Sequence, residues 1–308
     1  MEFSGFAIAL SWPETYCKQA GAWYDTLMQR LGFNHQGYYK AGHAAVVLVQ
    51  SRTGKCHYFD FGRYHAPFAN GRVRSADTDP ELKVLTTALI HEDKITNIED
   101  ILSEHAKRKA CHGSGDLHAS ICRINFETSW EKALSLQNKS PLPYGPFVLN
   151  GTNCSRFVQT ILLAGKPNLA MRIKLKFLYT LTPAPITNVK ALRHSKVIPV
   201  YADKNFYCAI RFNDVLPEPP RPEYLPRTAQ WLAGEGAGSW FYFKKELDKF
   251  MISRYADDGS LEFKTTYQLL NKEAFNLKKD FKTTYLSHHQ QIRVIQAGKM
   301  FEFTPLSN

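Results

Sequence analysis

Two residues far apart in the sequence have the types and the settings that thiol chemistry needs. Cys154 follows Gly-Thr-Asn and opens a segment with helical spacing, so the first backbone N–H groups of a helix would lie beside its thiol. His43 opens a run of strand-forming residues, Gly-His-Ala-Ala-Val-Val-Leu. A nucleophilic cysteine needs a base within hydrogen-bond reach, and the base needs a partner that orients it. We therefore predict that Cys154 is a nucleophile and that His43 is its base.

The orienting partner follows from the pairing of two strands. Two runs of strand-forming residues flank a Gly-containing turn at 51–54, which predicts a hairpin. Closing that turn pairs residues whose numbers sum to about 105, so Asp60 lies opposite Ala45 and diagonally from His43. Asp60 is therefore the candidate third member of the site. His57 falls on the other face, and a register slip of one residue would reverse this choice.

The same residues outline a mechanism through a thioester. His43 removes the thiol proton, and the thiolate attacks an amide or ester carbonyl. The backbone N–H of Cys154 and a neighbouring donor hold the oxyanion. Tyr144 and Asn153 are the candidates for that second donor or for the wall of the pocket. His43 then protonates the leaving group, and water or a second acyl acceptor resolves the thioester.

These motifs, in this order, resemble the circularly permuted branch of the NlpC-like, papain-like thiol hydrolases. Here a His opens a strand, a second strand carries a polar residue, and Asn-Cys-Ser-Arg opens a helix much later. In ordinary members of the superfamily the Cys helix comes first. The resemblance covers roughly residues 40–165, with 1–39 completing the domain. It implies Cys154 as nucleophile, His43 as base and Asp60 as the third polar residue.

The resemblance implies an acyl-transfer mechanism through the thiol, but it does not imply one particular substrate. The superfamily includes peptidases and amidases of cell-wall peptides, deubiquitinase-like peptidases, and lipid acyltransferases of the lecithin:retinol type. Our first choice is a hydrolase that cleaves an amide bond in a peptide or a peptidoglycan stem. One alternative is a lipid acyltransferase or lipid hydrolase, which a long apolar groove beside Cys154 would favour. The other is a non-catalytic protein that binds an anionic polymer.

Element patterns predict an α+β protein with two domains. The first, 1–212, is a permuted papain-like catalytic domain with an antiparallel sheet and packed helices. Five prolines between 214 and 227 exclude a helix or a central strand and predict a connector over 213–238. Residues 239–308 predict a small β-rich domain. Helical spacing predicts helices at 14–31, 81–89, 97–109, 128–137 and 153–165.

The charge of the chain is concentrated in one stretch. The formal net charge is +11, and ten Lys and Arg but no Asp or Glu lie between Lys132 and Ala202. Because this stretch contains Cys154, we predict that it lowers the pKa of the thiol and attracts an anionic substrate. The rest of the chain is close to neutral and holds no RNP, zinc-finger or P-loop pattern. Specific nucleic-acid binding is therefore not expected.

Six cysteines form no C-x-x-C pair and no zinc spacing, so we expect neither a disulfide scaffold nor a metal or other cofactor. No apolar run reaches the roughly 18 residues that cross a bilayer. The apolar run at 6–10 lacks a basic lead and a cleavage site, so it is not a signal peptide. The cytoplasm is the default location, with export by a signal-independent route left open; the oligomeric state is unknown. We expect five cysteines to be buried apolar residues: Cys17, Cys56, Cys111, Cys122 and Cys208.

Overall fold

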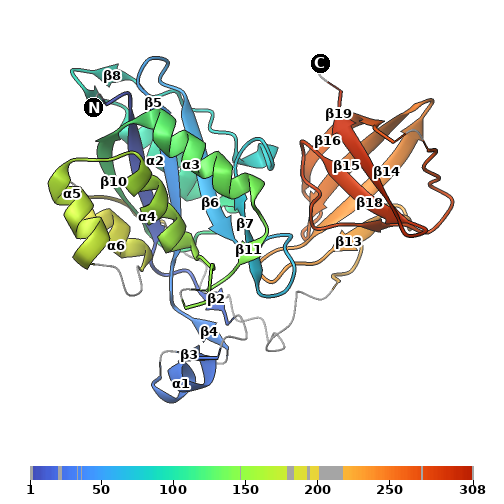
Figure 1. Ribbon diagram of the computed structural model, residues 1–308, viewed down its shortest axis with the longest axis horizontal. Helices are drawn as coiled ribbons and strands as arrows, with labels where there is room; N and C mark the ends of the chain where they lie inside the picture. The colour runs from blue at the N-terminus through green and yellow to red at the C-terminus, as the bar shows by residue number, and fades with distance from the viewer. Residues whose placement is uncertain are drawn as a thin grey trace.

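The chain folds into two β-sheet domains that lie side by side (Figure 1). The computed structural model describes residues 3–19, 23–32, 34–35, 37–145, 147–178, 184–192, 195–200, 218–271 and 273–306. Cys208 and the first part of the expected connector, 213–217, lie outside the described residues. No helix among the residues described is long and apolar enough to cross a membrane.

The N-terminal domain is built on a seven-stranded antiparallel sheet with the order β11-β7-β6-β5-β1-β10-β12. Strand β1 lies in the middle of it and is buried along its whole length, because both faces of the sheet are covered. The strands are β1 (Gly5–Trp12), β5 (His43–Gln50), β6 (Cys56–Gly62), β7 (Asn70–Arg74), β10 (Leu117–Ile124), β11 (Leu142–Pro143) and β12 (Lys196–Ile198).

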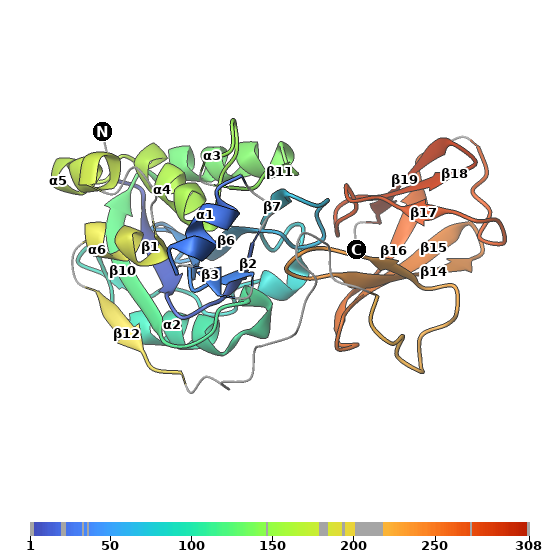
Figure 2. The ribbon, with the colours of Figure 1, turned by 90° about the horizontal axis from the view of Figure 1, so that it is seen from below.

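Helices cover the two faces of this sheet unequally, as the view from below shows (Figure 2). Helices α3 (Phe126–Asn138), α4 (Cys154–Ala164) and α6 (Pro185–Ala191) pack on one face, together with α5 (Leu169–Ile173) and the π-helical turn Lys174–Leu178. Helix α2 (Ile98–Lys107) and the short 3₁₀ turns Pro80–Leu82 and Lys109–Cys111 cover the other. The sheet therefore separates two apolar cores.

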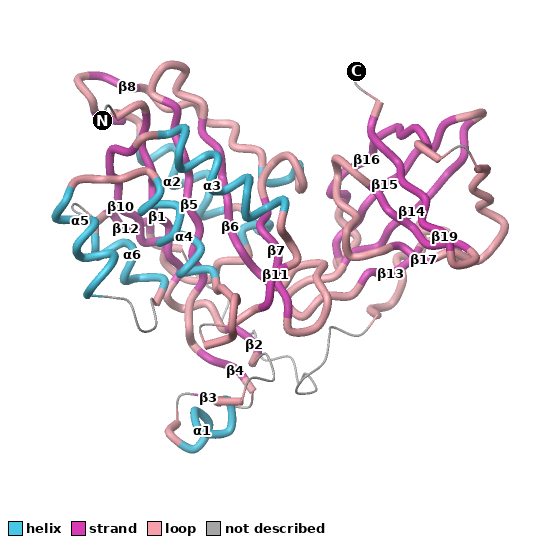
Figure 3. The backbone as a smooth tube through the Cα atoms, viewed as in Figure 1, coloured by secondary structure: helices cyan, strands magenta, loops and turns pink. Residues whose placement is uncertain are grey.

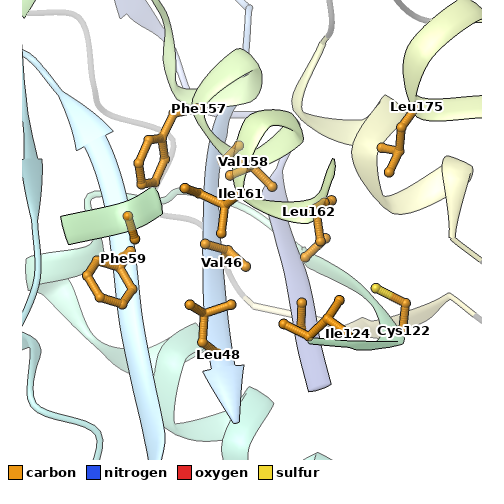
Figure 4. Packing of buried hydrophobic residues seen from close by; sticks show 14 of the residues in the cluster. Val46, Leu48, Phe59, Cys122, Ile124, Phe157, Val158, Ile161, Leu162 and Leu175 are labelled. Carbon is orange, nitrogen blue, oxygen red and sulfur yellow. The ribbon is translucent and has the colours of Figure 1, made fainter. Parts of the chain in front are cut away.

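Helix α4 is held in place by its apolar stripe. Phe157, Val158 and Ile161 point from α4 onto β5 and β6, where they meet residues such as Val46 and Phe59 (Figure 4). All five are at most 1% exposed. Burying side chains of this size contributes about 1.5–3 kcal/mol each. This packing fixes the N-terminus of α4, and with it Cys154, relative to strands β5 and β6.

Two of the expected helices are wrong. Residues 14–31 contain only the short α1 (Asp25–Arg30) and a strand, β2 (Cys17–Lys18), in a small sheet with β4 (Tyr38–Tyr39) and β3 (Asn34–His35). The apolar stripe of the expected helix has no core to cover, since its Trp, at position 23, is 77% exposed. In 81–89 only the 3₁₀ turn is helical, because the Glu104 side chain of α2 accepts the backbone N–H groups that a helix would use.

The C-terminal domain is a second seven-stranded antiparallel sheet, with the order β13-β14-β15-β16-β19-β18-β17. The side chain of Gln230 hydrogen-bonds to Phe281 O and Thr283 N, which brings the two edge strands together and nearly closes a barrel. Because β13 pairs with β14, we propose that this domain begins before Gln230, inside the range expected as connector. The strands are β13 (Gln230–Leu232), β14 (Ser239–Glu246), β15 (Lys249–Ala256), β16 (Leu261–Leu269), β17 (Lys282–Thr283), β18 (Ile292–Gln296) and β19 (Lys299–Pro305).

The junction between the domains is made largely of loops (Figure 3) and is rich in buried charge. Arg254 of β15 is 0% exposed and contacts Asp79 and Glu81 of the N-terminal domain, as well as Glu262 of its own. Arg72 of β7 binds Asp79 through both terminal nitrogens. Charges buried to this extent are stable only when they are paired, so the two domains are fitted to each other.

Candidate active site

Cys154 is the first residue of α4, as the sequence predicts. Asn153 is the N-cap, and its side-chain oxygen accepts the Arg156 N–H at 2.8 Å. The thiol lies within hydrogen-bond reach of two backbone N–H groups, those of Ser155 and of Ala44 on β5. Because Ala44 directly follows His43, the nucleophile candidate sits at the start of the strand that carries the base candidate.

His43 and Asp60 come together as the predicted hairpin requires. Strands β5 and β6 pair with Ala45 opposite Asp60, which is the predicted register. His43 Nε2 lies 3.4 Å from Asp60 Oδ2. This distance fits an ion pair but is too long for a well-aligned hydrogen bond. His43 Nε2 has no hydrogen-bond partner in the part of the chain that the structure describes.

Asp60 is bound more tightly by an arginine than by His43. Arg74 of β7 donates from Nε to Oδ1 at 3.0 Å and from Nη2 to Oδ2 at 2.5 Å. The Tyr58 hydroxyl donates to Oδ2 at 3.1 Å. Burial acts to raise the pKa of Asp60, but the Arg74 guanidinium and His43 outweigh it and hold that pKa well below its usual range. Asp60 is therefore a carboxylate at any pH near neutrality.

Aromatic rings fix the imidazole of His43 from two sides. Trp12 pairs with His43 across β1 and β5, and the two rings stack with centroids 5.8 Å apart. Tyr64 meets His43 edge-on at 6.3 Å and supports the Arg74 guanidinium 4.0 Å above its ring. His112 stacks on Tyr64 in turn, with centroids 4.4 Å apart. Packing against these rings thus helps to hold the base candidate in place.

The sheet separates His43 from Cys154. His43 lies on the same face of β5 as Ala45, in the core covered by α2, whereas Cys154 packs with Ala44 in the core covered by α4. The two can meet only around the end of β5, where the strand begins. No hydrogen bond joins them among the described residues, and they are 6% (Cys154) and 4% (His43) exposed. Both side chains are therefore buried, and the hydrogen bond between base and nucleophile is not formed among the described residues. Catalytic hydrogen bonds commonly tighten only when substrate binds.

The predicted lowering of the Cys154 pKa is wrong. Burial raises the pKa of this thiol to about 12, Cys17 and Asp60 add to the rise, and the backbone N–H groups of Ala44 and Ser155 only partly offset it. Part of the basic stretch lies on α5 and the turn after it, beyond the C-terminus of α4. Lys166 is exposed there, separated from Cys154 by about 15 Å of helix. Such exposed charges are screened over roughly 8 Å at physiological salt.

Tyr144 and Asn153 both lie close to Cys154. Tyr144 forms a β-bridge with Thr152, and its ring stacks on Phe61 with centroids 5.8 Å apart. Burial, with Cys154 and Cys17 nearby, raises the Tyr144 pKa well above its usual value, so this hydroxyl keeps its proton. Asn153 uses its side-chain oxygen as the helix cap, which leaves only the side-chain NH₂ for a substrate oxygen.

Three residues near the site were not predicted from the sequence. Arg74 holds Asp60, Arg63 lies 4.8 Å above the Tyr144 ring, and the partly buried Cys17 donates from its thiol to Gly42 O at 3.4 Å. The alternation Arg-Val-Arg in β7 is a signal for two arginines on one face of a buried strand. Cys17 and Arg63 have no comparable signal, because their roles depend on contacts across long stretches of chain.

The described residues contain no group of three or more His, Cys, Asp or Glu side chains that could hold a metal ion. Cys111 and Cys122 are buried in the two apolar cores, and Cys17 and Cys56 are partly exposed. The reactive groups that the described structure brings near one another are the Cys154 thiol, the His43 imidazole, the Asp60 carboxylate and the backbone N–H groups around them.

Comparisons with known proteins assign both domains. A family model described as type VI secretion system effector TseH-like matches residues 7–171, and one described as DUF6695 C-terminal domain matches 229–306. Among solved structures, the crystal structure of the type VI secretion system effector TseH is 20% identical with a TM-score of 0.36, covering 54% of this chain and 78% of that one. No curated protein matches the chain. Because the first match spans more than half of the chain and includes Cys154, His43 and Asp60, the chain belongs to the TseH-like family of type VI secretion system effectors.

Proposed function

We propose that this protein is a cysteine hydrolase that cleaves an amide bond in a peptide or in a peptidoglycan stem. The observation that carries the proposal is the proximity of three elements, β5, β6 and the N-terminus of α4, near the start of β5. Asp60 faces His43 at 3.4 Å, and the thiol of Cys154 lies against the backbone N–H of the residue that follows His43. Membership of an effector family and the resemblance to permuted NlpC-like hydrolases both support this choice.

The raised pKa of Cys154 favours general-base catalysis over a preformed thiolate–imidazolium pair. At neutral pH the buried thiol keeps its proton, so His43 must remove it as the thiol attacks the carbonyl. The Cys154 N–H belongs to the first helical turn, where backbone donors lack partners within the helix, and it is the first donor for the oxyanion. The side-chain NH₂ of Asn153 or the hydroxyl of Tyr144 supplies the second donor. His43 returns the proton to the amine, and water resolves the thioester.

The surroundings of Cys154 support an amide substrate over a lipid acyl chain. Tyr64 and Tyr144 lie near enough for Cys154 to affect their pKa values, and Cys17 affects the pKa of Cys154, so hydroxyl and thiol groups lie near the nucleophile candidate. A cleft of about 710 Å³ lies elsewhere, between the end of α3 and the loop before β18. A closed site also means that residues over Cys154 must move before a carbonyl can reach the thiol.

The family also supports a route of action. We propose that the protein is exported as an effector by a type VI secretion system. An anionic substrate, which the net charge predicts, stays a proposal. The exposed basic residues on α5 lie away from the thiol, so they do not act on it directly.

Labelling with an iodoacetamide probe tests the site. At pH 8 we expect Cys154 to react and His43→Ala to slow that reaction, with the modified peptide identified by mass spectrometry. His57→Ala is the matched control, because His57 lies on β6 but packs against Trp130 on the other face of the sheet. Equal labelling in all three proteins would overturn the proposed pairing.

Activity is tested on purified peptidoglycan and on peptides released from it. We expect the wild-type chain to release fragments with a new amine and a new carboxylate, and Cys154→Ser to release none. Fragments from both proteins alike would show that another residue, or a contaminant, performs the cleavage.

A further inference from the structure

We infer that Glu235, in the loop that leads into β14 of the C-terminal domain, is a positioning residue for the active site. The inference rests on the proposed function. It assigns the C-terminal domain a part in building the catalytic site. Glu235 is 2% exposed, which is unusual for a carboxylate and requires a partner.

The loop 234–238 lies along the segment that joins β6 to β7. Gly236 N donates to Arg63 O at 2.8 Å, and His65 N donates to Ala237 O at 3.1 Å. Tyr64 and Ala237 form a parallel β-bridge. The approach is so close that a Cβ on Gly234 would lie 2.1 Å from Ala237 O and 2.8 Å from His65 N. The C-terminal domain thus extends the active-site domain by a short strand-like contact.

The Glu235 carboxylate binds two groups in this segment. One oxygen pairs with Arg63 Nη1, and the other accepts the backbone N–H of Ala69. Both side chains of the pair are at most 6% exposed, so the pair is shielded from water. Removing the Glu235 carboxylate would leave a buried, unpaired arginine, which would strongly destabilise the folded protein. Arg63 and Glu235 therefore depend on each other.

Arg63 carries the effect of Glu235 to the nucleophile side of the site. Its guanidinium donates to the carbonyl oxygens of Lys18 and Gln19, the latter at 3.3 Å, and lies 4.8 Å above the Tyr144 ring. Lys18 follows Cys17, whose thiol donates to the residue before His43. Arg63 therefore joins the strand β2, the loop before Cys154 and the start of β5 at one point.

Tyr64 carries the effect to the base. Its backbone is fixed by the two hydrogen bonds from the loop 234–238, and its ring contacts His43 and lies under Arg74. Arg74 in turn holds Asp60. One loop of the C-terminal domain thus orders both walls of the site, although none of its residues touches the reacting atoms.

The test measures how strongly Cys154 labelling depends on His43. The readout is the ratio of the iodoacetamide rate in a protein with His43 to the rate in its His43→Ala counterpart, from pH 6 to pH 9. We expect Glu235→Gln to lower this ratio roughly tenfold or more, because displacements of about 1 Å at a reacting centre cost up to about a hundredfold. Glu235→Asp, which keeps the charge, should restore part of the ratio.

Glu302→Gln is the matched control, since Glu302 lies in the same domain and pairs with Arg293 far from the site. It should leave the ratio unchanged. If Glu235→Gln fails to fold, Arg63→Gln combined with Glu235→Gln removes the unpaired charge. That double variant should recover the melting temperature but not the ratio.

Two outcomes are distinguishable. A large wild-type ratio that stays the same in Glu235→Gln overturns the positioning role and leaves the proposed function intact. A wild-type ratio near one overturns the His43–Cys154 pairing, and the positioning role with it.

Discussion

Asp60 contacts both Arg74 and His43, and the shorter contacts are with Arg74. The guanidinium binds both carboxylate oxygens, at 3.0 and 2.5 Å, while His43 is 3.4 Å away. Much of the carboxylate charge is therefore already compensated. Asp60 can orient the imidazole, but it offers little net negative charge to stabilise an imidazolium.

Removing Asp60 should expose its structural role. Asp60→Asn leaves Arg74 buried without a counter-charge, so we expect the free energy of unfolding to fall by about 3–5 kcal/mol. Combining Asp60→Asn with Arg74→Met should recover part of the loss in a urea titration. If the double variant is no more stable than Asp60→Asn alone, the two residues are not coupled as described.

The raised pKa of Cys154 predicts a particular pH dependence. A buried thiol with a pKa of about 12 is almost entirely protonated at pH 7, so its iodoacetamide rate should rise continuously from pH 7 to pH 10. The measurement is the rate of labelling of the Cys154 peptide at fixed ionic strength. A plateau between pH 5 and pH 8 would indicate a thiolate–imidazolium pair and would contradict this assignment.

At the scale of elements, α4 depends on its N-cap as well as on its apolar stripe. Asn153→Ala removes the acceptor for the Arg156 N–H, and we expect a loss of about 1 kcal/mol in thermal unfolding. Asn153→Asp keeps the cap and should be nearly as stable as the wild type.

The same pair of variants separates the cap from the oxyanion role. Asn153→Asp replaces the side-chain NH₂ by an oxygen, so it should lose turnover at unchanged stability if that NH₂ holds the oxyanion. Full turnover in Asn153→Asp would leave Tyr144 as the second donor.

At the scale of the whole molecule, the junction carries more acid than base. In the cluster around Arg254, the acids are Asp79, Glu81 and Glu262, and Arg72 is the second positive charge in the ion pairs that the structure describes there. One negative charge is in excess. Burial raises the pKa of Glu81 to about 7; Arg254 opposes this, while Asp79 and Glu262 add to it. Its Oε2 atom is buried with no partner among the described residues, which suits a protonated carboxyl.

This excess predicts that the junction weakens as the pH rises. The folded-state pKa of Glu81 lies above its unfolded value, so its contribution to stability is full below about pH 4.3 and is lost as the pH rises through about 7. We expect Glu81→Gln to flatten this dependence and to exceed the wild type by about 1–3 kcal/mol at pH 8. Urea titrations at pH 4.5 and pH 8 measure it. A wild type that is more stable than Glu81→Gln at pH 8 would contradict the assignment.

Local patterns in the sequence are enough to place the three candidate site residues on their elements. The turn at 51–54 sets the register of β5 and β6, and register depends only on near neighbours. The same holds for the start of α4, where the cap and the helical spacing are adjacent in the chain. The expected helix at 14–31 shows the limit of such patterns, because an amphipathic stripe forms a long helix only where a core exists to bury it.

What the tertiary structure decided is the environment of those residues. The count of ten basic residues suggested an acidic thiol, but desolvation of the buried group outweighs charges that lie on exposed helices. The Arg74 clamp on Asp60 and the Glu235 contact with Arg63 join residues 14 and 172 positions apart. The sequence by itself supplied the three groups to which we assign the proposed chemistry. Burial and long-range pairing, which depend on the complete packed chain, decided their protonation, their partners and the part of the second domain in holding them.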